Sequence, residues 1–196
     1  RVMVNQSWQR IFGVGLVRTP EDFGVQGRQS THPELLDWLS VEFQEQGWNH
    51  KQLLRTMVTS RTFCQSSARR GDIEDSENRL YARGPSFRLD AEVLRDVGLW
   101  ASGLLDPTMG GEGVKPYQPP GMWLAMAHPG SNTKNYVADK GERLYRRSLY
   151  VYWKRTSPHP MMTLFDAPSR EASCVRRSTT NTSLQALALL NETQRI

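Results

Sequence analysis

The sequence is poor in cysteine and histidine. Its two cysteines, Cys64 and Cys174, form no CxxC pair, and its four histidines form no HxH or HxxxH pair. Metal sites built from local ligands need such spacings, so we predict no metal site and no cofactor on this chain. One disulfide stays open as an alternative for an exported protein, whereas two unpaired thiols are the favoured interpretation.

The sequence also lacks a long apolar run and contains few lysines. Its longest apolar run falls far short of the roughly 20 residues that span a membrane, so we expect no membrane span. The net charge is +5, yet only 5 of the 25 basic residues are lysines, and arginine favours specific pairing. A charge cluster is more often a solvated or ion-paired face, so we do not expect nucleic acid as a partner. The best candidates for such a face are Arg146, Arg147, Lys154 and Arg155.

Length and helical periodicity predict a mainly helical protein. A chain of 196 residues fits one large domain, and we predict a single domain over residues 1–196, cut from a larger multidomain protein. Helices are predicted before Gly13, from a capping box at Thr31 to Glu34, and from a cap at Asn49. A further helix is predicted with Asp90 as its cap. Its apolar side carries Val93, Val97, Trp100 and Leu104, and another side carries Glu92, Arg95 and Asp96.

Two segments depart from the helical pattern, which makes the expected class mainly α with minor β. Apolar and polar residues alternate from Leu149 to Lys154, and this period predicts one short strand or hairpin near residues 147–154. Residues 106–142 contain six glycines and five prolines and are predicted to form a long loop, lying as a wall or lid over residues 166–177. The acidic run from Asp72 to Glu77 is predicted to be a solvated surface loop.

The C-terminal part, from Tyr145 to Asn191, holds the candidate site. A capping box from Thr182 to Gln185 opens a helix that is apolar on every side, and we expect this helix to be buried beneath the site. Carboxylates beside guanidinium groups can hold an anion or a polyol with directional hydrogen bonds. The alternative is a structural network of ion pairs. The candidate catalytic residues are Asp166, Glu171 and His159, and the candidate ligand-binding residues are Arg170, Arg176, Arg177, Asn181 and Trp123.

Several long phrases occur in an order that resembles one known family. They are VNQSWQRIFGVGLVRTPEDFG, HPELLDWLSVEF, FRLDAEVLRD, VKPYQPPGMW, LYRRSLYVYWKR and FDAPSREASCVRRSTTNTSLQALALLN. Together they resemble the planctomycete-type secreted-domain family, a domain of unknown function, from Arg1 to Asn191. The resemblance implies a C-terminal domain of a large exported or cell-envelope protein, following another uncharacterised domain and often a cytochrome c-like domain.

The chain departs from the pattern of that family at two places. Gln6 stands where the family commonly has arginine, and Phe63-Cys64 stands where it has an aromatic followed by a basic residue. The second departure argues against a family-wide disulfide between Cys64 and Cys174. The chain contains no CxxCH motif, so the haem of the neighbouring domain is not expected here.

Three classes of function remain open at this stage. The first is an accessory module that binds a carbohydrate or an anionic polymer such as a polysaccharide. The second is an enzyme acting on glycan-like substrates, in one version passing electrons to a neighbouring haem domain. The third is a structural module that docks the neighbouring domains of the same polypeptide.

Overall fold

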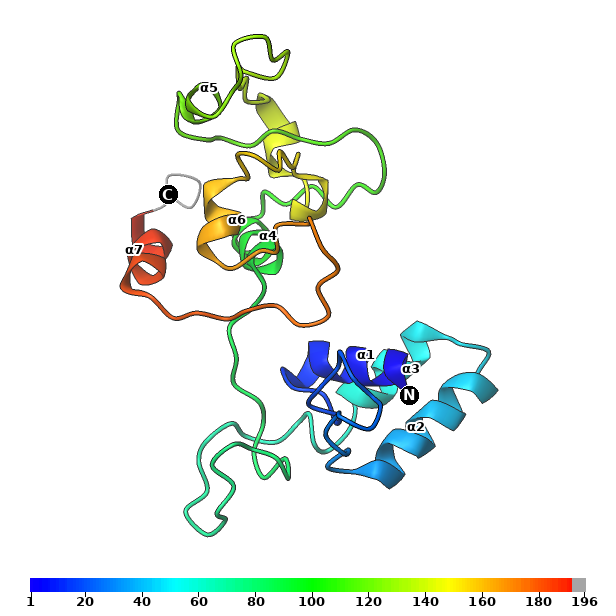
Figure 1. Cartoon of the computed structure of the whole chain (residues 1–196). Helices are drawn as coiled ribbons and strands as arrows, with labels where there is room; N and C mark the ends of the chain where they lie inside the picture. The colour runs from blue at the N-terminus through cyan, green and yellow to red at the C-terminus, as the bar shows by residue number, and fades with distance from the viewer. Residues whose placement is uncertain (192–196) are drawn as a thin grey trace. The chain divides into compact units, whose positions relative to one another are not determined.

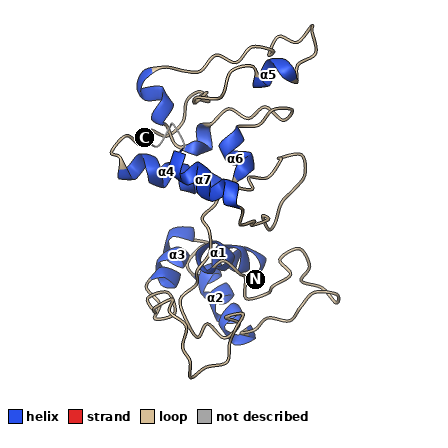
Figure 2. Ribbon diagram, turned by 90° about the vertical axis from the view of Figure 1, so that its left-hand side faces the viewer, coloured by secondary structure: helices blue, strands red, loops and turns tan. Residues whose placement is uncertain are grey.

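The computed structural model describes residues 1–191. The protein is mainly helical, and the described residues form no β-sheet (Figure 2). The chain divides into two compact units, Arg1–Phe87 and Arg88–Ile196, which are described separately below as unit 1 and unit 2. The single domain proposed for residues 1–196 stays a prediction.

Unit 1 is built on three helices around an apolar core. They are α1 (Val2–Phe12), α2 (Pro33–Glu45) and α3 (His50–Val58). Trp8 stacks on Phe12 with ring centroids 4.1 Å apart, and both are buried. Asn49 caps α3 as predicted, since its side chain accepts a hydrogen bond from Gln52 N at 3.2 Å. The capping box predicted at Thr31 to Glu34 is wrong, because α2 begins at Pro33 with no side-chain cap.

Buried polar side chains hold the loops of unit 1. The Asn5 side chain donates to Val17 O at 3.0 Å and accepts from Val17 N at 2.8 Å. Asp75 is also buried, and its carboxylate accepts from the backbone amides of Arg79 and Leu80 at 2.6 and 2.8 Å. The prediction of a wholly solvated acidic loop is therefore wrong at Asp75, because its carboxylate closes a turn of the backbone.

Unit 2 contains short helices joined by long irregular segments (Figure 1). A small apolar core lies among α4, α6 and the irregular chain. Its buried members are Ala91, Val114, Val151, Met162 and Phe165. The helices are α4 (Ala91–Ala101), α5 (Met122–Ala125), η1 (Gly141–Tyr145), η2 (Ser148–Tyr150), α6 (Pro160–Leu164) and α7 (Ser183–Asn191).

The strand or hairpin predicted near residues 147–154 is not observed. The short 3-10 helix η2 occupies part of this segment, and Val151 forms only an isolated parallel bridge with Val114. The alternating pattern fails because its apolar residues do not share one face. Leu149 is exposed, whereas Val151 is buried. Residues 106–142 are mainly irregular and carry α5, and a second isolated bridge joins Asp106 to Arg146.

The C-terminal helix α7 lies at the surface, which corrects the prediction that it is buried. Of its residues with described side chains, only Gln185 is buried, at 4% exposure. Ala188 packs against the core of unit 2. An apolar composition on all sides does not determine which side faces inward, and here a polar residue is the anchor. The exposed leucines, at 40% to 76%, are Leu184, Leu187, Leu189 and Leu190.

Candidate functional site

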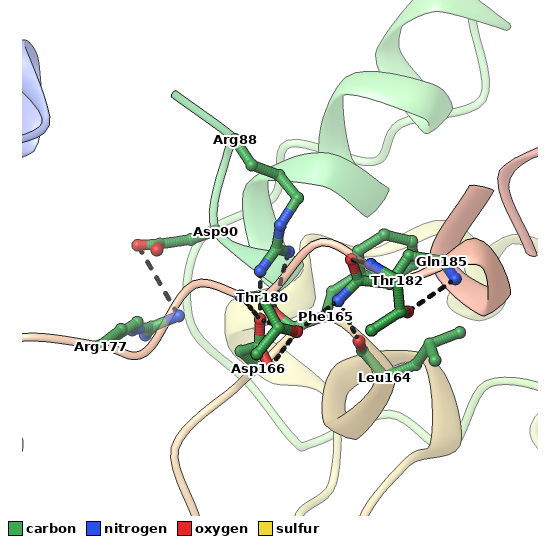
Figure 3. A network of polar contacts seen from close by, with 9 residues as sticks. All are labelled: Arg88, Asp90, Leu164, Phe165, Asp166, Arg177, Thr180, Thr182 and Gln185. Carbon is green, nitrogen blue, oxygen red and sulfur yellow. Dashed lines mark hydrogen bonds and ion pairs between the residues drawn. The ribbon is translucent and has the colours of Figure 1, made fainter. Parts of the chain in front are cut away.

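Asp166 lies at the centre of a polar network in unit 2 (Figure 3). Its carboxylate accepts hydrogen bonds from Arg88 Nη2, from Thr180 N at 2.7 Å and from Thr180 Oγ1 at 3.0 Å. Arg88 also donates to Phe165 O at 3.1 Å. Asp166 has a positive φ of 61°, a conformation that aspartate tolerates better than most residues. This carboxylate therefore joins three segments that are distant in the sequence.

Gln185 extends the same network to the start of α7 (Figure 3). Gln185 N donates to Thr182 Oγ1 at 3.2 Å, and Thr182 N donates to Gln185 Oε1 at 3.1 Å, so the predicted capping box is confirmed. Gln185 Nε2 also donates to Leu164 O at 2.8 Å and to Thr180 Oγ1 at 3.0 Å. The box thus attaches α7 to the end of α6 as well as capping it.

Arg177 and Glu92 form a second charged contact close to the first. Arg177 Nη1 lies 2.5 Å from Glu92 Oε2, Arg177 Nη2 lies 3.2 Å from Glu92 Oε1, and Asp90 lies 3.7 Å from Arg177. Burial raises the pKa of Glu92, but the hydrogen bond and charge of Arg177 outweigh it, so the pKa is lowered overall. Arg170 lies over the Trp153 ring at 4.5 Å and 4.0 Å from Glu92.

The remaining residues predicted near this cluster are exposed. Glu171 makes one hydrogen bond, from its backbone amide to Ser169 Oγ. Within the described part of the chain its carboxylate has no ion-pair partner, and it does not join the Asp166 network. Arg176 and Asn181 are exposed as well. Both cysteines are free and exposed, and Cys174 Sγ lies 3.3 Å from the backbone oxygen of Arg176.

His159 and Trp123 belong to a different part of unit 2. His159 Nε2 lies 3.0 Å from Tyr117 O, so it must donate the proton. Trp123 is buried. The centroid of its ring lies 4.8 Å from that of Tyr136 and 4.3 Å from Lys154 Nζ. These contacts connect residues 117–136 to residues 154–159. None of them reaches residues 166–177, where the loop was predicted to form a wall.

The arrangement is that of a structural network rather than of paired acid and base groups. Asp166 and Arg177 are committed to partners within the protein. No hydrogen bond or ion pair links Asp166, Glu171 and His159 to one another in the described residues. General acid and base catalysis needs two titratable groups that converge on one substrate, and these three do not share a network. Their assignment as catalytic residues stays a prediction.

Sequence reasoning missed how α4 is oriented. Arg95 faces inward, donating from Nη1 to Arg146 O at 2.9 Å and from Nη2 to Leu144 O at 2.6 Å. Asp96 accepts from Ser148 N at 2.7 Å. In residues 144–148 one isolated bridge, with Asp106, uses only part of the backbone hydrogen-bonding capacity, so the carbonyls of Leu144 and Arg146 and the amide of Ser148 bond with side chains. The polar side of α4 supplies these bonds and is therefore turned toward the interior.

Ala91 and Leu99 of α4 are buried and Leu94 packs against the core, whereas a second set of apolar residues faces outward. Val93, Val97 and Trp100 are spaced i, i+4 and i+7, which places them on one face of the helix, and Leu104 follows three residues after the helix ends at Ala101. They are between 44% and 73% exposed, and Trp100 is the most exposed. No charged residue interrupts this outward face, which consists of Val93, Val97, Trp100 and Leu104 and is called the α4 outer face below.

Comparison with known proteins assigns the chain to a family. The family model PSD1, described as a protein of unknown function (DUF1553), matches residues 1–196. The chain belongs to the PSD1 family. No curated protein and no solved structure matches it. Membership of a domain family of unknown function is thus confirmed, whereas the association of PSD1 with planctomycetes and with a cytochrome c-like domain remains an implication of the resemblance.

The described residues of this PSD1 chain show neither a membrane-spanning helix nor a metal-binding cluster. Within residues 1–191, no helix is both long and apolar enough to pass through a membrane. The same residues contain no cluster of three or more histidine, cysteine or acidic side chains arranged to hold a metal ion.

Proposed function

We propose that this chain is a docking module that binds a neighbouring domain of the same polypeptide through the α4 outer face. The supporting observation is that Val93, Val97 and Trp100 of α4 stay exposed, while its inward side is formed by Arg95 and Asp96 together with apolar residues such as Leu99. An apolar face that is exposed and uninterrupted by charge is typical of an interaction surface.

The size of the α4 outer face suits such a contact. Full burial of a large apolar side chain is worth about 1.5 to 3 kcal/mol, and roughly half of each side chain remains to be buried here. Each of Val93, Val97, Trp100 and Leu104 would then contribute on the order of 1 kcal/mol to association. Trp100 is the expected centre, because tryptophan is enriched among residues that dominate binding energy.

The family resemblance implies a neighbouring domain of the same polypeptide, which is the proposed occupant of the α4 outer face. In an exported protein of this kind, the neighbour can be a cytochrome c-like domain. The polar network supports the same reading. Asp166, Arg177 and Gln185 hold the loops around α4 and α7 in place, which a docking surface requires. The enzyme hypothesis has less support, because its candidate acid and base residues are not brought together.

The test is a titration of the purified chain with the remainder of its polypeptide, produced separately. We expect saturable binding that is weakened at least tenfold by Val97→Glu or Trp100→Glu, because each places a charge in an apolar contact. Val25→Glu is the matched control. Val25 is fully exposed in unit 1, and its replacement should leave binding unchanged.

Two outcomes would contradict the proposal. One is binding that both substitutions leave intact. The other is association of the chain only with itself, lost in the Trp100 variant, because the occupant would then be a second copy rather than a neighbouring domain. Circular dichroism of each variant confirms that the helices are retained before binding is interpreted.

A further inference from the structure

Four of the five lysines of the chain come together at one end of unit 2. They are brought there by contacts between separate segments. Asp139 N donates to Lys115 O at 2.9 Å, and Lys154 Nζ donates to Thr133 O at 2.8 Å, beside Lys134. Tyr152 N donates to Val114 O at 2.8 Å. The group formed by Lys115, Lys134, Lys140, Lys154 and Arg155 is called the lysine cluster below.

The charge of the lysine cluster is poorly compensated. The segments 114–140 and 152–155 contain one carboxylate, Asp139, against these five cations. Asp139 Oδ2 accepts from the backbone amide of Lys115 at 2.8 Å and does not form an ion pair with a lysine. In the part of the chain that the structure describes, no lysine of the cluster has a carboxylate partner, whereas arginines such as Arg88 and Arg177 do.

Aromatic rings hold two of the ammonium groups in place. Lys154 Nζ lies 4.3 Å from the centre of the Trp123 ring, and Lys115 Nζ lies 5.3 Å from that of Tyr152. A cation over an aromatic face is attracted to it, yet its charge is not neutralised. Lys134 and Lys140 are exposed. The cluster therefore presents positive charges, two of them on aromatic rings and two exposed, that lack a carboxylate partner among the described residues.

We propose that the lysine cluster binds an acidic polysaccharide. Lysine is a hydrated point charge, which suits sulfate or carboxylate groups spaced along a sugar chain without demanding a forked geometry. A single-stranded nucleic acid would need free aromatic faces on which its bases stack. The rings of Trp123 and Tyr152 already face ammonium groups, and Trp123 is buried, so the polysaccharide is favoured.

This inference is independent of the docking proposal, since it uses other residues and another partner. The experiment measures binding of the whole chain to dextran sulfate and to polygalacturonate, with neutral dextran and a single-stranded oligonucleotide as comparisons. Dextran sulfate carries sulfates and polygalacturonate carries carboxylates, so the two arms identify which anionic group is preferred. We expect binding to at least one of them, none to neutral dextran, and weakening as salt is added.

The variant Lys134→Gln/Lys140→Gln tests the site itself. Both side chains are exposed, so their replacement should not affect folding. By analogy with single-stranded polyanions, removing two contacts should reduce the slope of log affinity against log salt by about 1.4. Lys51→Gln is the matched control, because Lys51 is the remaining lysine and is exposed in unit 1.

Three results would overturn the inference. They are failure to bind either acidic polysaccharide, binding that the double substitution leaves unchanged, and tighter binding to the oligonucleotide than to both polysaccharides. The last result would assign the lysine cluster to nucleic acid instead. None of these results depends on the α4 outer face, so failure here and failure of the docking proposal can be told apart.

Discussion

Replacing His159 with glutamine should reduce the pH dependence of stability between about pH 6.5 and 4. The His159 imidazole is 2% exposed, and among the described residues its Nδ1 atom has no hydrogen-bond partner. Burial lowers the pKa of His159 from 6.5 to about 4, although the hydrogen bond to Tyr117 O acts to raise it. The positive charge of Arg95 lowers this pKa further.

The sign and size of the effect follow from this pKa. Below about pH 6.5 the unfolded chain binds a proton at His159 that the folded chain does not, so stability falls as the pH decreases toward 4. Above pH 6.5 the neutral His159 contributes fully to the stability of the folded protein, and below about pH 4 this contribution is lost. The difference between the pKa of His159 in the unfolded chain, 6.5, and in the folded chain, about 4, corresponds to about 3 kcal/mol of unfolding free energy.

The assay is urea unfolding of the wild type and of His159→Gln at several pH values from 4 to 7.5. Glutamine can still donate to Tyr117 O but does not titrate, so the stability difference between the two proteins should change by about 3 kcal/mol over this range. His128→Gln is the control, since His128 is exposed. A difference that stays constant with pH, or an NMR titration of His159 with a midpoint near 6.5, would refute the reasoning.

Three other substitutions test contacts on which the fold depends. Arg95→Ala should destabilise the protein by about 3 kcal/mol in urea unfolding, because the carbonyls of Leu144 and Arg146 lose their donor. Arg95→Lys should recover little of this stability, since one ammonium group cannot reach both carbonyls as the forked guanidinium group does. Asp166→Asn should cost about 3 kcal/mol by leaving the largely buried Arg88 without its carboxylate, while binding to dextran sulfate is unchanged. Gly27→Ala should lower the thermal midpoint, because a Cβ there would lie 2.1 Å from Asp22 O, whereas Gly24→Ala meets only the Asp22 side chain at 3.1 Å and should be tolerated better. An unchanged midpoint in Gly27→Ala, or wild-type stability in either of the other two variants, would show that the contact concerned is not formed.

Some helix ends could be predicted from local sequence, although the predicted cap Asp90 precedes α4 without a side-chain capping hydrogen bond. The cap at Asn49 and the capping box at Thr182 and Gln185 are interactions between residues three apart, so the sequence contains all the information they need. The box at Thr31 fails because Pro33, which is favoured at the first helical position, starts α2 instead.

The orientation of α4 could not be predicted because it depends on distant partners. Arg95 is turned inward by hydrogen bonds to the carbonyls of Leu144 and Arg146, about 50 residues later in the chain. Periodicity identifies the two sides of a helix but favours burial of the apolar one. Similarly, the partner of Asp166 is Arg88, 78 positions earlier, which no local pattern indicates.

The candidate site stays a prediction. Asp166 pairs with Arg88 and Arg177 pairs with Glu92, contacts of the kind that the interpretation as a structural ion-pair network describes. The acidic partner of Arg177 is Glu92 on α4 rather than a residue of its own segment. The surface position of α7 was missed because its leucines suggested burial, whereas Gln185 is the residue that faces inward.

The most direct test of the docking proposal is hydroxyl-radical labelling of residues 93–104, read by mass spectrometry. It compares the chain alone with the longer polypeptide that contains it. We predict strong labelling of Trp100 in the chain alone, in keeping with its 73% exposure, and at least fivefold protection in the longer polypeptide. Equal labelling of Trp100 in both would contradict the account, because the α4 outer face would then remain exposed where its partner is present.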